Sequence, residues 1–333
     1  MRSLLRPVWN DAEGRLRAGW RILIHLSLFL FAPPLLNQAI GPAISRTMAG
    51  LAPELAVVSD RITLSGLRLV VVIVATWLVV RFLDRRPWRD LGLQMDGRWW
   101  RDFGYGLALG ALLMTFVFLV EYIAGWVQVR ELFAVGLPDT PFWIAILGPL
   151  VVFVVVGVTE ELLSRGYQLR NLAEGLNYPP WGAKAALVVA WVISSSLFGL
   201  LHVFNPNATW ISTVYLMLAG IFLGLGMVLT GRLGMPIGLH ITWNFFQGNV
   251  YGFPVSGNTF TSATFIAIVQ GGPVLWTGGA FGPEAGLIGI AAILLGCLMT
   301  VMWVRWRYGA VRLQTSLACY QPRQAPAPPL PQV

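Results

Sequence analysis

Long apolar stretches, separated by short polar or arginine-rich segments, recur along almost the whole chain. Runs of about 18 or more apolar residues are typical of membrane-spanning helices, because roughly 20 residues at 1.5 Å rise cross the hydrocarbon core. Hydropathy indicates about eight spans. Their approximate limits are residues 19–40, 62–83, 103–126, 142–172, 182–203, 210–231, 235–251 and 284–306. The pattern therefore predicts an all-α fold, a polytopic bundle of transmembrane helices.

Two segments near the C-terminal end interrupt this pattern. Residues 251–283 are rich in Gly, Ser, Thr and Asn, and only their middle, from Phe265 to Trp276, is apolar enough to dip back into the bilayer. The stretch from Gln321 onwards is rich in proline and cannot form a core, so it predicts an extended tail.

Composition supports a membrane protein. The chain has 333 residues, of which 56% are hydrophobic and 11% are charged, and its mean hydropathy is +0.68. Ordinary soluble domains contain about 25% charged residues. The two cysteines, Cys297 and Cys319, form neither a disulfide framework nor a zinc motif.

The net charge is +8, and the distribution of Arg and Lys between the segments, rather than this total, indicates the orientation in the membrane. If the N-terminus is cytoplasmic, the outer segments contain only Arg46, Arg61 and Arg130, and the inner segments contain Arg2, Arg6, Arg15, Arg17, Arg85, Arg86, Arg89, Arg98, Arg101, Arg165, Arg170, Lys184, Arg232, Arg305, Arg307, Arg312 and Arg323. This asymmetry predicts that both termini are cytoplasmic. The basic residues form no stripe interleaved with aromatics, so no nucleic-acid partner is expected.

Ionisable side chains at membrane depth are costly, and each one is a candidate for a functional site. The fourth span reads FVVVGVTEELLSRGYQLR and contains the neighbouring Glu160 and Glu161. Glu161 and Arg165 are four residues apart and can pair on one helix face. Glu160 points about 100° away around the helix, so it is left for chemistry.

Two further spans place polar pairs four residues apart. The fifth ends SSSLFGLLHVFNPN, with Phe198 and His202 on one face, and the seventh reads MPIGLHITWNFF, with His240 and Asn244. Glu160 precedes and His202 follows the predicted turn at Asn177–Pro180. At a rise of 1.5 Å per residue they lie roughly 25 and 33 Å from this turn. If the two helices are antiparallel neighbours, both side chains therefore lie at a similar depth in the membrane. Such groups can satisfy one another inside a membrane.

Three other polar residues lie within predicted spans: His25, Arg68 and Glu121. For these we expect interhelical pairing or orientation rather than chemistry.

Taken together, three motifs of this chain resemble those of the CPBP family. They are Glu160-Glu161-x-x-x-Arg165, Phe198-x-x-x-His202 and His240-x-x-x-Asn244. This family, also called the ABI domain, contains CAAX proteases and bacteriocin-processing enzymes, which are intramembrane glutamic endopeptidases. The resemblance covers about 142–250, and the segment GGAFGPEAG after the seventh span is more loosely similar to bacterial members.

The resemblance implies roles for individual residues. Glu160 matches the general base, His202 the residue that helps to bind and activate water, and His240 and Asn244 the groups that stabilise the oxyanion. Glu161, Arg165 and Phe198 are expected to support them. Burial raises the pKa of a carboxyl and suits a base, and neutral N–H donors suit an oxyanion. By analogy with the family, the site is expected to open towards the cytosol.

The resemblance also suggests a division of the chain. Residues 1–141 form an N-terminal cytoplasmic segment and the first three spans, and residues 142–250 form a CAAX-protease-like catalytic core. Residues 251–306 form an outer loop, either re-entrant or on the surface, and the last span. Residues 307–333 form a Pro-rich cytoplasmic tail. The expected partners are the lipid bilayer and a membrane-associated protein or peptide substrate. The expected location is a bacterial cytoplasmic membrane.

Alternatives stay open at this stage. No cofactor is expected, but Glu160, His202 and His240 could instead bind zinc as an open catalytic site with a water. A proton-coupled transporter could use the same residues as a relay, although no inverted repeat is evident. A non-catalytic membrane scaffold or immunity factor of the same fold is a third interpretation. The sequence does not select the substrate or say whether it is prenylated.

Overall fold

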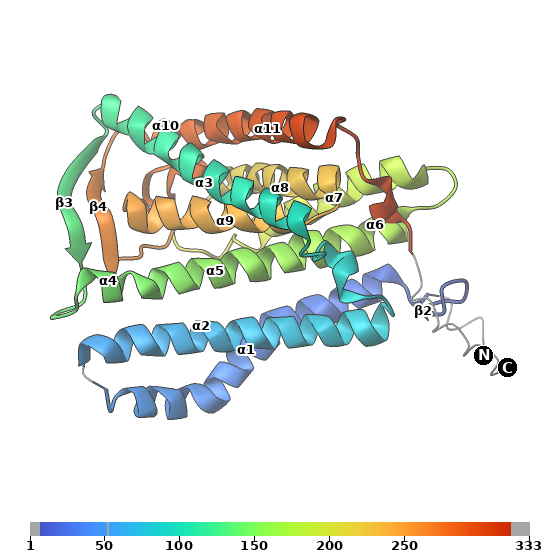
Figure 1. Cartoon of the computed structure of the whole chain (residues 1–333), viewed down its shortest axis with the longest axis horizontal. Helices are drawn as coiled ribbons and strands as arrows, with labels where there is room; N and C mark the ends of the chain where they lie inside the picture. Colours follow the sequence, from blue (N-terminus) through green and yellow to red (C-terminus); the bar gives the residue numbers. More distant parts are fainter. Residues whose placement is uncertain (1–6, 52, 321–333) are drawn as a thin grey trace.

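Seven helices of the described chain are long and apolar enough to cross a membrane. The computed structural model describes residues 7–51 and 53–320, and the long helices lie side by side, with the first and last described residues at the same end of the bundle, called here the terminal end (Figure 1). The α-helices of these residues are α1 (Ala18–Met48), α2 (Pro53–Leu78), α3 (Gly97–Ile123), α4 (Phe142–Ala145), α5 (Leu147–Glu161), α6 (Arg170–Leu176), α7 (Gly182–Leu200), α8 (Trp210–Thr230), α9 (Gly234–Phe245), α10 (Val274–Thr277) and α11 (Leu287–Tyr308). The predicted fold class is confirmed.

The predicted span at 235–251 differs from the others. It forms α9, an α-helix of 12 residues, followed by a π-helical turn at Phe246–Val250. This helix is shorter than the roughly 20 residues that cross a bilayer. Nearly all its side chains are buried between α3, α5 and α8, so α9 is an inner helix rather than a lipid-facing span.

Close packing of α9 on α3 depends on four glycines. A Cβ added at Gly106 or Gly110 of α3 would lie 2.3 Å from Met235 O or 2.4 Å from Thr242 Oγ1, and one added at Gly238 of α9 would lie 2.3 Å from Phe103 O. Gly234 is equally crowded against Trp99. Small residues four apart allow helix backbones to approach closely in membrane proteins. These glycines therefore set the position of α9, which contains two of the candidate site residues.

Substituting Gly238→Ala is expected to lower the free energy of unfolding by about 1–3 kcal/mol, because overpacking forces the two backbones apart. Thermal unfolding of the purified protein in detergent measures this change. Gly104→Ala on α3 is the matched control, because nothing lies within 4 Å of a Cβ added there. Equal unfolding temperatures for the two variants would contradict the proposed packing role.

The described chain also contains two short β ladders that the all-α expectation missed. β1 (Trp9–Asn10) pairs with β2 (Arg15–Leu16), and β3 (Val127–Val135) pairs antiparallel with β4 (Ala263–Gln270). The apolar stretch considered for re-entry into the bilayer thus contains β4, whose backbone groups are paired with β3. This ladder lies across the end of the bundle opposite the termini, at the left in Figure 1.

Buried ion pairs join the N-terminal segment to the helix bundle. Glu174 of α6 accepts hydrogen bonds from Arg15 at 2.8 Å and from Arg86 at 2.5 Å, and Arg21 of α1 pairs with Asp84. All these side chains are buried. These ion pairs connect α1 and the segment after α2 with α6. Buried charged side chains therefore hold these three parts of the chain together.

The C-terminal part after α11 is only partly described. Leu317 and Ala318 are buried in the core, and Asn177 Nδ2 donates to Ala318 O at 2.9 Å. The first part of the predicted tail, up to Tyr320, therefore packs on the bundle. The Pro-rich stretch from Gln321, together with Arg2, Arg6 and Arg323, lies outside the described residues.

Of the three isolated polar residues, His25 has an interhelical partner, as the sequence predicts, whereas Glu121 pairs with a residue of strand β4. His25 Nε2 lies 2.9 Å from Thr76 Oγ1 and its ring stacks on Tyr167. Glu121 accepts a hydrogen bond of 2.8 Å from Gln270. Arg68 is exposed on α2, beside a hollow between α1 and α2.

Candidate active site

Helices α5 and α9, which contain two of the three motifs, both change from α-helix to π-helix at the candidate site. α5 ends at Glu161 and continues as a π-helical segment, Leu162–Leu169, and α9 continues as the π-helical turn Phe246–Val250. π-helical turns inside α-helices occur frequently at functional sites, because they shift side chains around the helix axis. In both helices the motif residues Glu160, Glu161, His240 and Asn244 lie in the last turns of the α-helix, just before the π-helical segment begins.

Glu160 lies between the two motif histidines. Its Oε2 atom is 4.0 Å from His202 Nε2 and 4.0 Å from His240 Nε2. The side chains of Glu160 and His202 keep 19% and 17% of their exposure, so solvent reaches both. Polar atoms separated by more than 3.5 Å are commonly bridged by a water, and a water here would contact a carboxylate and an imidazole together.

The tautomer of His202 follows from its other hydrogen bond. His202 Nδ1 lies 2.8 Å from the carbonyl oxygen of Phe198. A carbonyl oxygen only accepts, so Nδ1 is assigned as the protonated nitrogen. In the neutral ring Nε2 is then an acceptor, and it faces Glu160.

Glu161 binds two donors at once. Its Oε1 atom lies 2.7 Å from Arg165 Nη1 and 2.8 Å from His240 Nδ1. The side chains of Glu161 and Arg165 are 0% and 1% exposed, and Arg165 also donates to Gly220 O at 2.8 Å. The sequence predicted the Glu161–Arg165 pair but not the bond to His240, which fixes the orientation of that ring.

Phe198 separates the charged groups from the surrounding apolar core. Its ring centroid lies 4.9 Å from that of His202 and 6.0 Å from that of His240, and the Arg165 guanidinium carbon lies 4.5 Å from the same centroid. Arginine over an aromatic face is a favourable cation–π contact. Phe198 therefore packs against three other site residues.

Glu160, Phe198, His202 and His240 border a cavity of about 150 Å³. Asn244, one helical turn after His240, also lines it. The cavity has apolar walls from α5, α8 and α11 and a polar rim from the segment that follows α9. The lining residues are Phe153, Val156, Glu160, Phe198, His202, Asn205, Leu216, Ala219, Phe222, Leu223, His240, Trp243, Asn244, Val255, Ser256, Asn258, Phe260, Glu284 and Ile293.

A second carboxylate besides Glu160 borders the cavity, and sequence analysis did not single it out. Glu284 is 3% exposed and accepts hydrogen bonds from the Ser256 backbone N–H and from Gln247. Burial raises the pKa of the Glu284 carboxyl, although the hydrogen bonds from Ser256 and Gln247 act in the opposite direction. Two features of the sequence could have pointed to Glu284. One is the segment GGAFGPEAG, which contains it, and the other is Gln247, a polar residue three positions after Asn244.

The structure thus brings Glu160, His202, His240 and Asn244 to one cavity, which Phe198 also lines, and places Glu161 and Arg165 behind them. Their chemical roles stay predictions. The described residues contain no group of three or more His, Cys, Asp or Glu arranged to hold a metal ion. We therefore derive no step through a metal.

Comparison with known proteins agrees with the sequence motifs. Residues 141–246 match the family model of the type II CAAX prenyl endopeptidases, Rce1-like. The chain is also 26% identical over 306 residues to YyaK of Bacillus subtilis (strain 168), described as an uncharacterized protein, with 83% of this chain and 96% of the relative covered. No solved structure matches the chain significantly. The resemblance to the CPBP family is confirmed over the matched segment, which contains the four predicted catalytic residues.

Proposed function

We propose that this chain, a CAAX-protease family member through residues 141–246, is an endopeptidase that hydrolyses peptide bonds inside the membrane with a water activated by Glu160. The family supports a membrane-embedded protease, and the seven apolar helices support an integral membrane protein. The glutamic mechanism rests on the geometry of the site.

Water activation is the first step of the proposed reaction. The 4.0 Å separation between Glu160 Oε2 and His202 Nε2 fits a water that donates one hydrogen to each acceptor. Its oxygen lone pair then points away from both groups. Glu160 removes a proton as this oxygen attacks the carbonyl carbon of the substrate, and a tetrahedral oxyanion forms.

Oxyanion stabilisation is assigned to His240 and Asn244. Because His240 Nδ1 donates to Glu161, its Nε2 atom is a donor only when the ring is cationic. The sequence-based expectation of a neutral imidazole donor therefore changes. Glu161 balances an imidazolium, and the set of Glu160, Glu161, Arg165 and cationic His240 has no net charge. Donors fixed in a water-poor site stabilise developing negative charge strongly.

Collapse of the intermediate completes the cycle. The oxyanion re-forms the carbonyl, the carbon–nitrogen bond breaks, and protonated Glu160 gives its proton to the leaving amine. The products are a new carboxylic acid and a new amine, and Glu160 returns to the carboxylate. Its contact with both histidines is the single observation on which the proposal depends.

The test is a comparison of membrane peptides from wild-type cells and from cells expressing Glu160→Ala. A peptide product that disappears with the substitution supports the protease and identifies its substrate. Identical peptide profiles would contradict it. Full complementation of a deletion by Glu160→Gln would favour a non-catalytic scaffold or immunity factor instead.

Metal dependence is checked separately. The purified enzyme is expected to keep its activity, within about twofold, after exhaustive treatment with a chelator, because no proposed step uses a metal. A zinc endopeptidase assayed in parallel serves as the control and should lose activity, since its water is activated by the metal. Loss of activity that added zinc restores would replace the glutamic mechanism with the metal-dependent one.

A further inference from the structure

The position of the cavity along the bundle bears on which side of the membrane supplies the substrate. α7 begins at Gly182, at the end of the bundle where the termini lie (Figure 1). His202 lies about 20 residues further on, roughly 30 Å away at 1.5 Å per residue. It belongs to the turn between α7 and α8, at the far end of α7. The candidate site is thus well removed from the termini.

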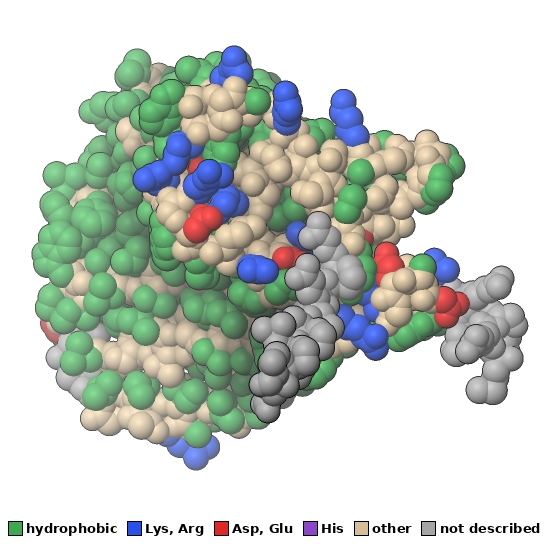
Figure 2. Space-filling view, turned by 45° about the vertical axis from the view of Figure 1, so that its right-hand side comes forward, with side chains coloured by type: hydrophobic (Ala, Val, Ile, Leu, Met, Phe, Trp, Pro, Cys, Tyr) green, Lys and Arg blue, Asp and Glu red, His purple; other side chains and the backbone are tan. Residues whose placement is uncertain are grey.

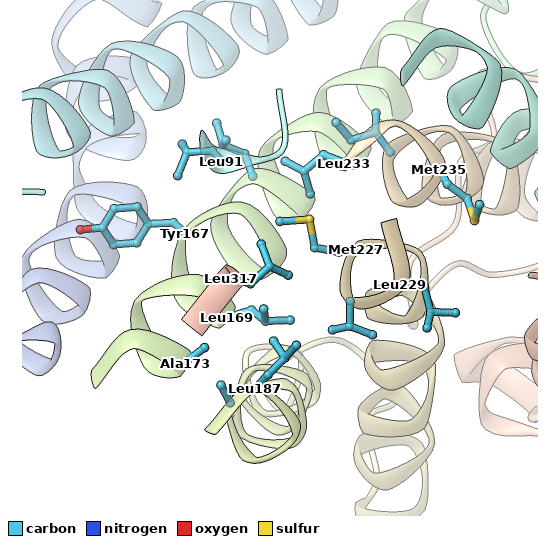
Figure 3. Close-up of a cluster of buried hydrophobic side chains, with 14 of the residues drawn as sticks. Leu91, Tyr167, Leu169, Ala173, Leu187, Met227, Leu229, Leu233, Met235 and Leu317 are labelled. Atoms are coloured by element: carbon cyan, nitrogen blue, oxygen red, sulfur yellow. The ribbon is translucent and has the colours of Figure 1, made fainter. Parts of the chain in front are cut away.

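The side of the site that faces the termini is closed. On this side, the neighbours of Glu160 are the buried Glu161–Arg165 pair and the buried ring of Phe198. Beyond them is a large cluster of buried hydrophobic side chains contributed by several helices (Figure 3). Tyr167, Leu169, Met227 and Leu233 in this cluster are each 0% exposed. Interiors packed to this density leave no path for water or a peptide.

The opposite side of the site is polar and partly open. Asn205, in the turn after α7, donates to Ser256 O at 2.9 Å, and Ser256 in turn contacts Glu284. Asn258, which also lines the cavity, is exposed to solvent. Polar side chains thus connect the cavity with the surface formed by residues 251–286. A substrate would enter from this end.

Charge indicates which side of the membrane this end faces. Lys and Arg side chains gather on the face that comes forward in Figure 2, which includes the right-hand end of the bundle in Figure 1. The segments at the cavity end contain Arg46, Arg61 and Arg130. Excess Arg and Lys marks the cytoplasmic side of membrane proteins. Cytoplasmic termini and a cytoplasmic opening, both expected from the sequence, are therefore incompatible in this structure.

We propose that the active site opens to the extracytoplasmic side, and that the substrate is a peptide segment presented at the outer half of the membrane. This inference rests on the proposed function and narrows its substrate class. Cytoplasmic prenylated tails are excluded by it. The cavity of about 150 Å³, with Phe153, Leu216, Phe222 and Ile293 in its walls, has room for an apolar side chain next to the bond that is cleaved.

Orientation is tested first, because that measurement needs no activity. In a Cys297→Ser and Cys319→Ser background, Thr259→Cys introduces a thiol beside the cavity mouth and Asp11→Cys introduces one in the β1–β2 turn. Both native residues are exposed. With a membrane-impermeant maleimide, Thr259→Cys should label in sealed right-side-out vesicles and Asp11→Cys only in inside-out ones. The reverse pattern would overturn the inference and leave the proposed function intact.

Substrate access is tested with the same two vesicle types. The probe is a mixture of internally quenched, membrane-impermeant peptides with apolar centres and charged ends, and Glu160→Gln vesicles give the background. Glu160-dependent cleavage should be at least tenfold faster in right-side-out than in inside-out vesicles, and detergent should abolish the difference. Faster cleavage in inside-out vesicles would overturn the inference alone, whereas absence of Glu160-dependent cleavage even in detergent would overturn the proposed function with it.

Discussion

Replacing Glu160 by Gln should lower the turnover number for peptide hydrolysis by about 10²–10⁴-fold, the usual contribution of a general base. The amide has nearly the same shape as the carboxylate, so it preserves packing against His202 and His240, but it cannot take a proton from water. Turnover of the purified enzyme, on a peptide found by comparing wild-type and Glu160→Ala membranes, measures the effect. The Michaelis constant should change little, because Glu160 acts on water.

The control for this substitution is Glu131→Gln, the same chemical change at an exposed position on β3. It should leave turnover unchanged. Both variants should unfold at the wild-type temperature, which separates a catalytic defect from a folding defect. A Glu160→Gln enzyme with more than a tenth of the wild-type turnover would rule out Glu160 as the base.

Replacing Arg165 by Met should reduce the free energy of unfolding by about 3–5 kcal/mol, because it leaves the Glu161 carboxylate buried without its main counter-charge. Glu161 Oε1 accepts from both Arg165 and His240, and its side chain has no exposed area. Thermal unfolding in detergent measures the loss. Turnover should fall as well, since Glu161 orients His240.

The double variant Glu161→Gln with Arg165→Met distinguishes charge from packing. It should be more stable than Arg165→Met alone, because removing both charges removes the uncompensated one. Arg312→Met, at an exposed position after α11, controls for the loss of an arginine and should be close to wild type. A double variant no more stable than the single one would show that Arg165 acts through packing.

The spans were predictable because the bilayer imposes a simple rule on composition. Seven of the predicted spans correspond to helices of sufficient length and hydropathy in the described chain. α9 is the exception, since a helix enclosed by other helices needs to be apolar but not long enough to cross the bilayer. Its enclosure depends on close packing against α3 at Gly234 and Gly238, which hydropathy does not measure.

The β3–β4 ladder could not be foreseen from hydropathy. β3 and β4 lie more than a hundred residues apart, and each becomes a strand by hydrogen bonding to the other. An apolar run of about eight residues is equally compatible with a strand, a short helix or a re-entrant loop. Only the approach of the two segments in space selects the strand.

The polar residues of the site were visible in the sequence because a membrane tolerates few of them. By itself the sequence determined the helical bundle, the side of the membrane expected for its termini, and the cluster of Glu160, His202, His240 and Asn244 as the place to look for chemistry. The tertiary structure decided which nitrogen of each histidine faces Glu160, that Glu161 holds His240, that Glu284 borders the cavity, and that the cavity opens away from the termini. These properties depend on distances and directions between separate helices, and a linear pattern of residue types does not specify them.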